Sequence, residues 1–202
     1  MGLIPRSRPQ LPPLDVRKIV NAKVPVPRHK VTILGIRGYY KDSMGKPGQN
    51  DRAVYDDAAF VLLSDRVVAF NFNTDPSAWR DGIATLVTGV WSFVVGWHKL
   101  GKKSGHAALR QNGLFTVRRD GRGLQTGEFG INLHRGGENG TSSLGCQTVP
   151  PDQWEEFRNL VYSALGVKLN IISIWTGAIK GATVQYVLVD RAEAEKILGR
   201  SL

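Results

Sequence analysis

The sequence predicts a mainly β fold with a minor helical part, in which an antiparallel sheet or sandwich carries one main helix after Cys146. Short apolar runs rich in β-branched and aromatic residues recur between turn-forming Gly, Asp and Asn residues, as is typical of strands. Only one long segment has the apolar spacing of an amphipathic helix. The 202 residues, 42% of them hydrophobic and 22% charged, are enough for one globular domain with a core.

The strands are expected at the apolar runs. Val31–Ile36 begins the pattern, and the turn Ser64-Asp65-Arg66 predicts a hairpin between residues 59–63 and 67–72. Alternation of apolar and polar residues over Gly130–His134 indicates a half-buried strand that stops in a Gly-rich loop, residues 136–145. Further strands are expected at residues 90–97, 114–118 and 186–189.

Two helices are expected in the second half of the chain. Asp152 can cap a helix over residues 153–165, which places Trp154, Phe157 and Val161 on one face, and Gly166 can end it. A shorter helix is expected over residues 192–198, before Gly199.

Residues 1–30 differ from the rest of the chain in charge and in proline content. They carry +6 of the net charge of +10 and six of the ten prolines, which predicts an extended basic arm before a domain over residues 31–202. A positive surplus favours a polyanionic partner. We expect the arm to dock to such a partner, and no specific nucleic-acid binding.

The hydrophobic segments predict neither a secretory leader nor a membrane span. Pro5 and Arg6 interrupt the first apolar residues, so the protein is expected to be made in the cytoplasm without a signal peptide. The run from Ile83 to Leu100 is broken by Gly, Ser and Thr and is too short to cross a bilayer. Its aromatic and β-branched residues favour a buried strand.

Cys146 and His134 are the candidate catalytic pair. A single cysteine excludes an internal disulfide, and a thiol becomes a nucleophile when a base takes its proton. His134 ends a predicted strand, and a Gly-rich excursion of 12 positions can return Cys146 to it. Gly145 lets backbone N–H groups approach a reacting carbonyl. A buried inert cysteine and a surface pair of His134 with Arg135 are the alternatives.

The strings Ile131-Asn-Leu-His134 and Ser143-Leu-Gly-Cys146 resemble the signature of the L,D-transpeptidase (YkuD-like) family. The resemblance implies a mostly β domain that acts on the stem peptides of bacterial peptidoglycan. It implies Cys146 as nucleophile, His134 as base and Gly145 as the oxyanion-loop glycine. It also implies Ser143 as the box serine, and a backbone carbonyl of Arg135 that orients the imidazole.

The chain departs from this signature at three points. Leu144 replaces the second box histidine, Thr148 replaces a polar Asn or Arg, and the loop between His134 and Cys146 is short. These departures leave the acceptor open between an amine and water, and we favour hydrolysis. Asn132 and His106 are expected to contact the substrate. The Gly-rich loop and the missing leader resemble phage-encoded lysis proteins, which implies action at the bacterial cell wall or periplasm and possible partners among virion proteins.

The sequence also offers residues for other classes of site. His98, His106, His134 and Cys146 supply enough ligands for zinc in a murein amidase or peptidase, although no short metal-binding spacing is present. No metal and no cofactor are therefore expected. A non-enzymatic basic wall-binding or structural virion module would make Cys146 replaceable.

Two polar loops also carry candidate residues. Adjacent acids at Asp56-Asp57 and the Asn50-Asp51 pair resemble the paired carboxylates of glycosidases, but such residues more often form turns. Segments 37–40 and 73–76 can rim a cleft, with turn chemistry as the favoured alternative.

Overall fold

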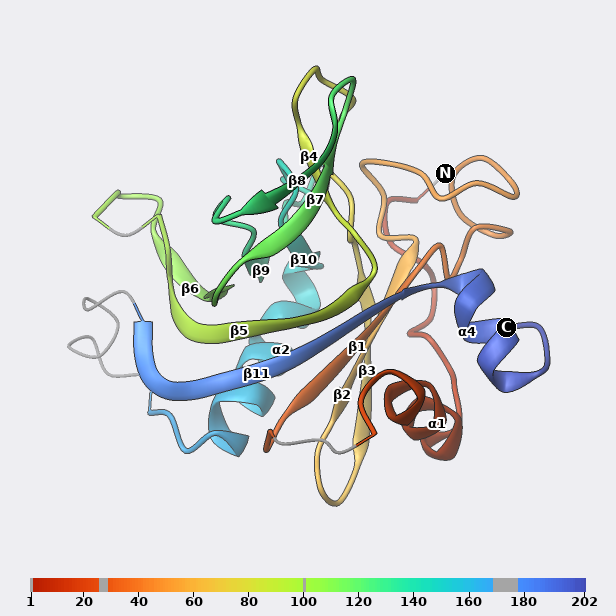
Figure 1. Cartoon of the computed structure of the whole chain (residues 1–202), viewed down its shortest axis with the longest axis horizontal. Helices are drawn as coiled ribbons and strands as arrows, with labels where there is room; N and C mark the ends of the chain where they lie inside the picture. The colour runs from red at the N-terminus through yellow and green to blue at the C-terminus, as the bar shows by residue number, and fades with distance from the viewer. Residues whose placement is uncertain (1, 26–28, 100, 169–177) are drawn as a thin grey trace.

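The computed structural model describes residues 2–25, 29–99, 101–168 and 178–202, and most of its strands belong to one large mixed sheet (Figure 1). The order is β10-β9-β6-β5-β11-β1-β2-β3, formed by Gln147–Val149, Leu133–Arg135, His106–Gln111, Gly89–His98, Ala178–Asp190, Thr32–Arg37, Asp57–Leu62 and Val67–Phe72. Strand residues exceed helical ones, 35% against 18%, so the mainly β prediction is confirmed. The sheet is not purely antiparallel, because β1 pairs with β11 and β9 with β10 in parallel.

One face of the sheet is covered at the β1–β2–β3 end by two helices, α1 (Pro13–Lys23) and α4 (Arg191–Leu198). Leu34, Ile36, Phe60 and Val187 pack there against side chains of these helices. Figure 1 shows α1 and α4 side by side at that end of the molecule. Gly199 ends α4 in the left-handed conformation, as its position after the periodic residues predicts.

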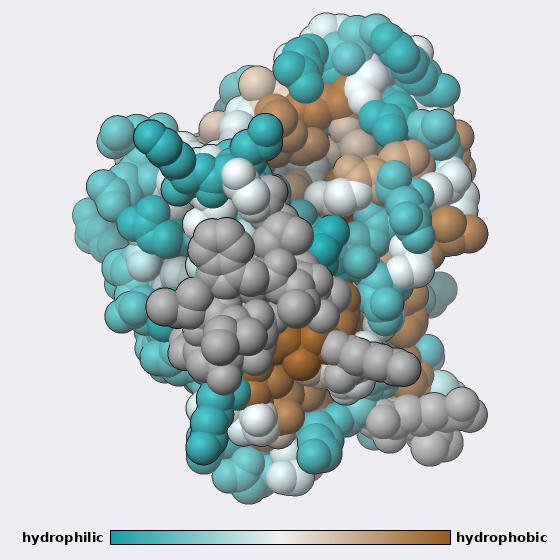
Figure 2. Space-filling view, turned by 90° about the vertical axis from the view of Figure 1, so that its left-hand side faces the viewer, coloured by the Kyte–Doolittle hydropathy of each residue, from teal (hydrophilic) through white to brown (hydrophobic). Residues whose placement is uncertain are grey.

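The main core lies between the sheet, helix α2 (Pro151–Ala164) and a second sheet of three strands. The second sheet has the order β4-β7-β8 and consists of Ala84–Leu86, Phe115–Arg119 and Gly123–Gly127. Phe157 of α2 makes an edge contact with Phe70, and Phe93 of β5 meets Phe115 of β7. Seen from the side of the β5–β6 turn, hydrophilic side chains dominate the surface and apolar atoms appear between them (Figure 2).

The predicted elements agree with the structure where local pattern is strong. The hairpin β2–β3, strands β1, β5 and β7, and helices α2 and α4 all form at the expected segments. Helix α2 starts earlier than expected: Pro150 is its N-cap and Pro151 its first residue, with no side-chain cap, and Asp152 lies in the first turn. Proline is tolerated there because the first N–H groups of a helix have no partner within it.

The expectation of an extended arm is wrong for Pro13–Lys23, which forms α1. Val16, Ile19 and Val20 are buried in the α1–α4 core, so this part of residues 1–30 contributes apolar side chains to the fold. Pro12 and Pro13 stand at the helix start, where they do not break it. Two of its basic residues also form ion pairs: Arg8 pairs with Glu156 at 2.5 Å, and Lys23 with Glu193 at 2.7 Å. The boundary at residue 30 stays a prediction.

Candidate functional site

Strands β9 and β10 bring Cys146 next to Asn132. The two strands are parallel neighbours in which Gln147 is opposite Leu133, so the Gly-rich segment between them returns the chain to the strand that carries His134. The backbone N–H of Asn132 donates to Cys146 Sγ at 3.4 Å, and Sγ lies 3.7 Å from the carbonyl oxygen of Gly130. The thiol therefore faces a polar backbone environment although its residue is only 9% exposed.

The imidazole of His134 is fixed by the carbonyl of its own neighbour. Its Nδ1 lies 2.7 Å from the carbonyl oxygen of Arg135, in line with the orientation that the resemblance implies. Because a carbonyl can only accept, Nδ1 carries the proton and the neutral ring presents a lone pair at Nε2. The structure has no hydrogen bond between this ring and Cys146 Sγ. Cys146 directly precedes β10, in which Thr148, two positions later, is opposite His134.

Two further histidines surround His134. The His98 ring stacks on it at 4.4 Å with an interplanar angle of 12°, and the His106 ring lies at 5.3 Å. The side-chain amide of Asn132 donates to His98 Nδ1 at 2.8 Å and so joins the histidines to the thiol. His106 Nδ1 donates to the carbonyl of Ser104, and its Nε2 is buried without a partner among the described residues.

The stacked rings bear on the zinc alternative. Parallel imidazoles present their nitrogens side by side, whereas zinc needs ligands that converge tetrahedrally at about 2.0–2.1 Å. Within the part of the chain that the structure describes, no three His, Cys, Asp or Glu side chains are arranged to hold a metal ion.

The loop before Cys146 is a tight turn held by Ser143. The Ser143 hydroxyl donates to the carbonyl of Cys146 at 2.7 Å and accepts from Gly145 N–H at 3.0 Å. Gly145 has φ of 118°, and a Cβ at this position would collide with the carbonyl oxygen of Ala84, so glycine is required. Because the N–H of Gly145 is engaged, the N–H of Cys146, which donates to none of the described residues, is the better oxyanion donor.

Burial sets the protonation states of the pair. It raises the pKa of the Cys146 thiol above its usual range, and the Asn132 N–H only partly opposes this. Burial, together with the neighbouring His98, lowers the pKa of His134 to about 3. Burial and His106 lower that of His98 to about 4. The resting pair is therefore a neutral thiol and a neutral imidazole at pH 7.

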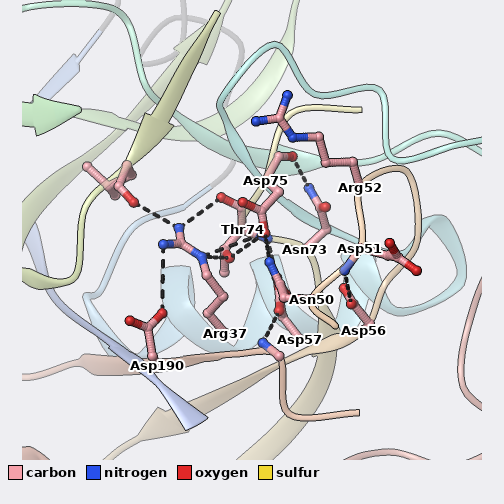
Figure 3. Close-up of polar contacts among 12 residues, drawn as sticks. Arg37, Asn50, Asp51, Arg52, Asp56, Asp57, Asn73, Thr74, Asp75 and Asp190 are labelled. Atoms are coloured by element: carbon pink, nitrogen blue, oxygen red, sulfur yellow. Dashed lines mark hydrogen bonds and ion pairs between the residues drawn. The ribbon is translucent and has the colours of Figure 1, made fainter. Parts of the chain in front are cut away.

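The segment opposite Cys146 is anchored by a buried polar cluster (Figure 3). The Arg37 guanidinium donates to both oxygens of Thr74 and lies 3.6 Å from the carboxylate of Asp75. Asp57 accepts from Thr74 N–H and from Gly38 N–H, each at 2.6 Å. Strands β1 and β2 thus fix the position of Thr74 through hydrogen bonds, of which those from the Arg37 guanidinium are charge-assisted.

Residues 73–77 connect this buried cluster to β10 by hydrogen bonds. Asn73 and Thr148 exchange backbone hydrogen bonds of 2.9 Å, and the Gln147 amide reaches the Thr74 carbonyl at 3.4 Å. Ser77 N–H donates to the carbonyl of Ser143 at 2.8 Å. The Cys146 turn is therefore held on both sides by a segment that the buried cluster positions.

The acids considered for glycoside cleavage have structural roles here. Asp56 and Asp57 are fully buried, and their carboxylates accept backbone N–H groups of Asp51, Gly38 and Thr74. Burial, with the charge of Asp75 adding to it, raises the pKa of Asp56 to about 7. Neither carboxylate reaches a surface where a sugar would bind, so we do not retain a glycosidase site.

Sequence reasoning missed the contacts that complete the site. It named Asn132 as a substrate contact, but not its bridge between the Cys146 thiol and His98, and it did not single out Gly130. The signal was available for Asn132, because residues 132 and 134 of one strand share a face. The described part of the chain has no helix with the length and apolar character that crossing a membrane requires. Comparison with protein-family models, curated proteins and solved structures gives no match.

Proposed function

We propose that the protein is a cysteine-dependent acyl-transfer enzyme that acts on stem-peptide amides of peptidoglycan, with hydrolysis favoured over transpeptidation. The observation that carries the proposal is the contact chain in which Asn132 joins the Cys146 thiol to a histidine cluster whose member His134 is oriented by the Arg135 carbonyl. The choice of peptidoglycan as substrate rests on the resemblance to the L,D-transpeptidase motif. The proposal that the fold is of the L,D-transpeptidase type rests on the same resemblance.

Acylation begins with the neutral pair. Rotation of the thiol away from Gly130 directs Sγ toward a substrate carbonyl, and His134 Nε2 takes the thiol proton as the carbon–sulfur bond forms. The backbone N–H of Cys146 donates a hydrogen bond to the oxyanion. The imidazolium then protonates the leaving amine as the carbon–nitrogen bond breaks, which gives a thioester and a neutral imidazole.

Deacylation uses the same groups in reverse. His134 Nε2 takes a proton from water, or from an acceptor amine, as its oxygen or nitrogen attacks the thioester carbonyl. The thiolate leaves and regains that proton from the imidazolium. The exposed Leu144 supplies no charge to hold an acceptor at this position, which supports water over an amine.

The place of action follows from the substrate. A peptidoglycan enzyme acts at the bacterial cell wall, and the virion-associated delivery that the sequence suggests would bring it there with virion proteins as partners. The non-enzymatic alternative, a wall-binding module, predicts that Cys146 can be replaced without loss of function.

The test is mass spectrometry of purified muropeptides incubated with the full-length protein. We expect new stem-peptide products that disappear with Cys146→Ala and fall by at least about 100-fold with His134→Gln, since general base catalysis contributes about 10²–10⁴-fold. Ser142→Ala on the same loop is the matched control, because Ser142 is exposed. Products that persist in Cys146→Ala would refute the proposal.

Alkylation and chelation separate thiol from zinc chemistry. Iodoacetamide should abolish turnover in proportion to modification of Cys146, whereas EDTA should leave turnover unchanged. Turnover that is lost to EDTA and restored by zinc would instead favour the metal alternative.

A further inference from the structure

A pocket is lined by two residues that also contact the Cys146 thiol, although Cys146 itself is not part of its wall. Its volume is about 330 Å³, near the lower end of the roughly 300–1,000 Å³ that is usual for small-ligand sites. Gly130 and Asn132, the two residues whose backbone atoms contact Cys146 Sγ, form part of its wall. The other lining residues are Val94, Arg110, Gln111, Asn112, Gly113 and Glu128.

The pocket contains one cation and one anion that do not neutralise each other. Arg110 is half-buried and Glu128 is exposed, and both line the cavity. Neither forms an ion pair within 4.0 Å with any side chain in the described segments. Two opposite charges that line one small cavity without pairing are complementary to a ligand that carries both a carboxylate and an ammonium group.

The wall that carries Glu128 is fixed in advance by Gln111. The Gln111 amide donates to the carbonyls of Gly113 and Gly127 at 2.9 Å, and its oxygen accepts from Phe129 N–H and Ile131 N–H at 3.0 and 3.1 Å. Three of these four hydrogen bonds hold residues 127–131 on both sides of Glu128. A site that is ordered before binding loses less conformational entropy when a ligand enters.

The sheet register places the cation on the face that bears His134. Arg110 is opposite Val94, and Ala108 is opposite His134. Arg110 lies two residues beyond Ala108, so alternation puts its side chain on the same face as His134. Asn132, which bonds to His98, also lines the pocket and so connects it to the histidine cluster.

We propose that this pocket binds an amino-acid zwitterion, with Arg110 holding the carboxylate and Glu128 the ammonium group. As a subsite that shares Gly130 and Asn132 with the surroundings of Cys146, it rests on the proposed function. The zwitterion can belong to a free amino acid or to the end of a side chain within a larger peptide substrate.

The test measures binding of three related probes to the full-length protein by NMR titration, in both D and L forms. Nε-acetyl-lysine carries the zwitterion, Nα,Nε-diacetyl-lysine lacks the ammonium group, and Nε-acetyl-lysine methyl ester lacks the carboxylate. We expect the dissociation constant of the zwitterion to be at least about tenfold lower than that of either blocked probe, because each blocked probe loses one charged hydrogen bond and such a loss weakens binding by about that factor. Equal affinity for all three probes would overturn the proposal.

Variants assign the two charges. Arg110→Gln should remove the preference over the methyl ester, Arg110→Lys should retain part of it, and Glu128→Gln should remove the preference over the diacetyl probe. Arg118→Gln and Glu155→Gln remove equal charges from exposed positions outside the pocket and should keep both preferences. If both binding preferences survive in Arg110→Gln and Glu128→Gln, the assignment is refuted. Because Glu128 is exposed, its substitution carries little risk to folding.

Two further comparisons separate the sources of ligand and the two proposals. Alanine that binds as tightly as Nε-acetyl-lysine identifies a free amino acid, whereas binding at least about tenfold weaker identifies the end of a longer chain. The binding assay needs no turnover, so it stands if Cys146→Ala shows that the acyl-transfer proposal is wrong. Conversely, a failed probe preference leaves the Cys146 chemistry intact.

Discussion

His134 should make the fold less stable in mild acid. Burial and His98 lower the pKa of its imidazole to about 3, whereas the ordinary value of 6.5 applies when the chain unfolds. Between these values the unfolded chain binds a proton that the folded protein does not, so the stability from this group is complete above about pH 6.5 and is lost as the pH falls. Lowering the pH from 7 to 5 should therefore cost about 2 kcal/mol through His134 alone.

The measurement is urea unfolding at pH 7 and pH 5 for the wild type and His134→Gln. The substitution itself changes the free energy of unfolding at both pH values, so the quantity to compare is the change in that free energy between pH 7 and pH 5. Asp56, whose pKa is raised, contributes to this change with the opposite sign, but its contribution is the same in both proteins and cancels. Leu144→Ala, at an exposed non-titrating position of the same site, should behave as the wild type. An equal pH dependence in the wild type and His134→Gln would refute the reasoning.

Three other predictions concern the helix at the start of the chain, the thiol and the buried cluster. Ile19→Ala should lower the free energy of unfolding by about 2–5 kcal/mol and exposed Leu14→Ala by less than about 0.5 kcal/mol, measured by urea unfolding. The rate of Cys146 alkylation by iodoacetamide should still rise between pH 8 and 9, because burial raises the thiol pKa above 9.0; a plateau below pH 8 would contradict this. Arg37→Met should cost about 3–5 kcal/mol in the same unfolding assay, because it leaves the buried carboxylate of Asp75 without its cation; an unchanged midpoint would show that the pair contributes nothing.

The sequence could predict those elements whose pattern is local. Strands β2 and β3 alternate around a short turn, and α4 ends at a glycine, so their positions follow from residues close in the chain. Helix α1 is not predicted by the proline content of residues 1–30, which disfavours helix. Proline at the first position of a helix is compatible with it, and Pro13 stands at that position in α1. The parallel pairing of β1 with β11 joins residues about 150 positions apart and leaves no local signal.

For the candidate site, too, the sequence predicts the features that depend on residues close in the chain and not those that depend on the order of strands. Residue type and resemblance identify Cys146 and His134, and the pairing of β9 with β10, which Cys146 directly precedes, agrees with the short Gly-rich excursion between them. The stack of His98 on His134 depends on three strands, β5, β6 and β9, lying side by side, and no spacing along the chain encodes that order. The Arg110 pocket depends on the same register.

The anchorage of the Cys146 turn explains why the buried charges of this protein lie away from the thiol. A reactive thiol needs a defined position, but charged groups next to it would also shift its pKa and that of its base. Here Arg37 and Asp57 fix the position of Thr74. Residues 73–77 in turn bind β10 through backbone and amide hydrogen bonds between uncharged groups. The thiol is thus held firmly while His134 stays neutral and able to accept its proton.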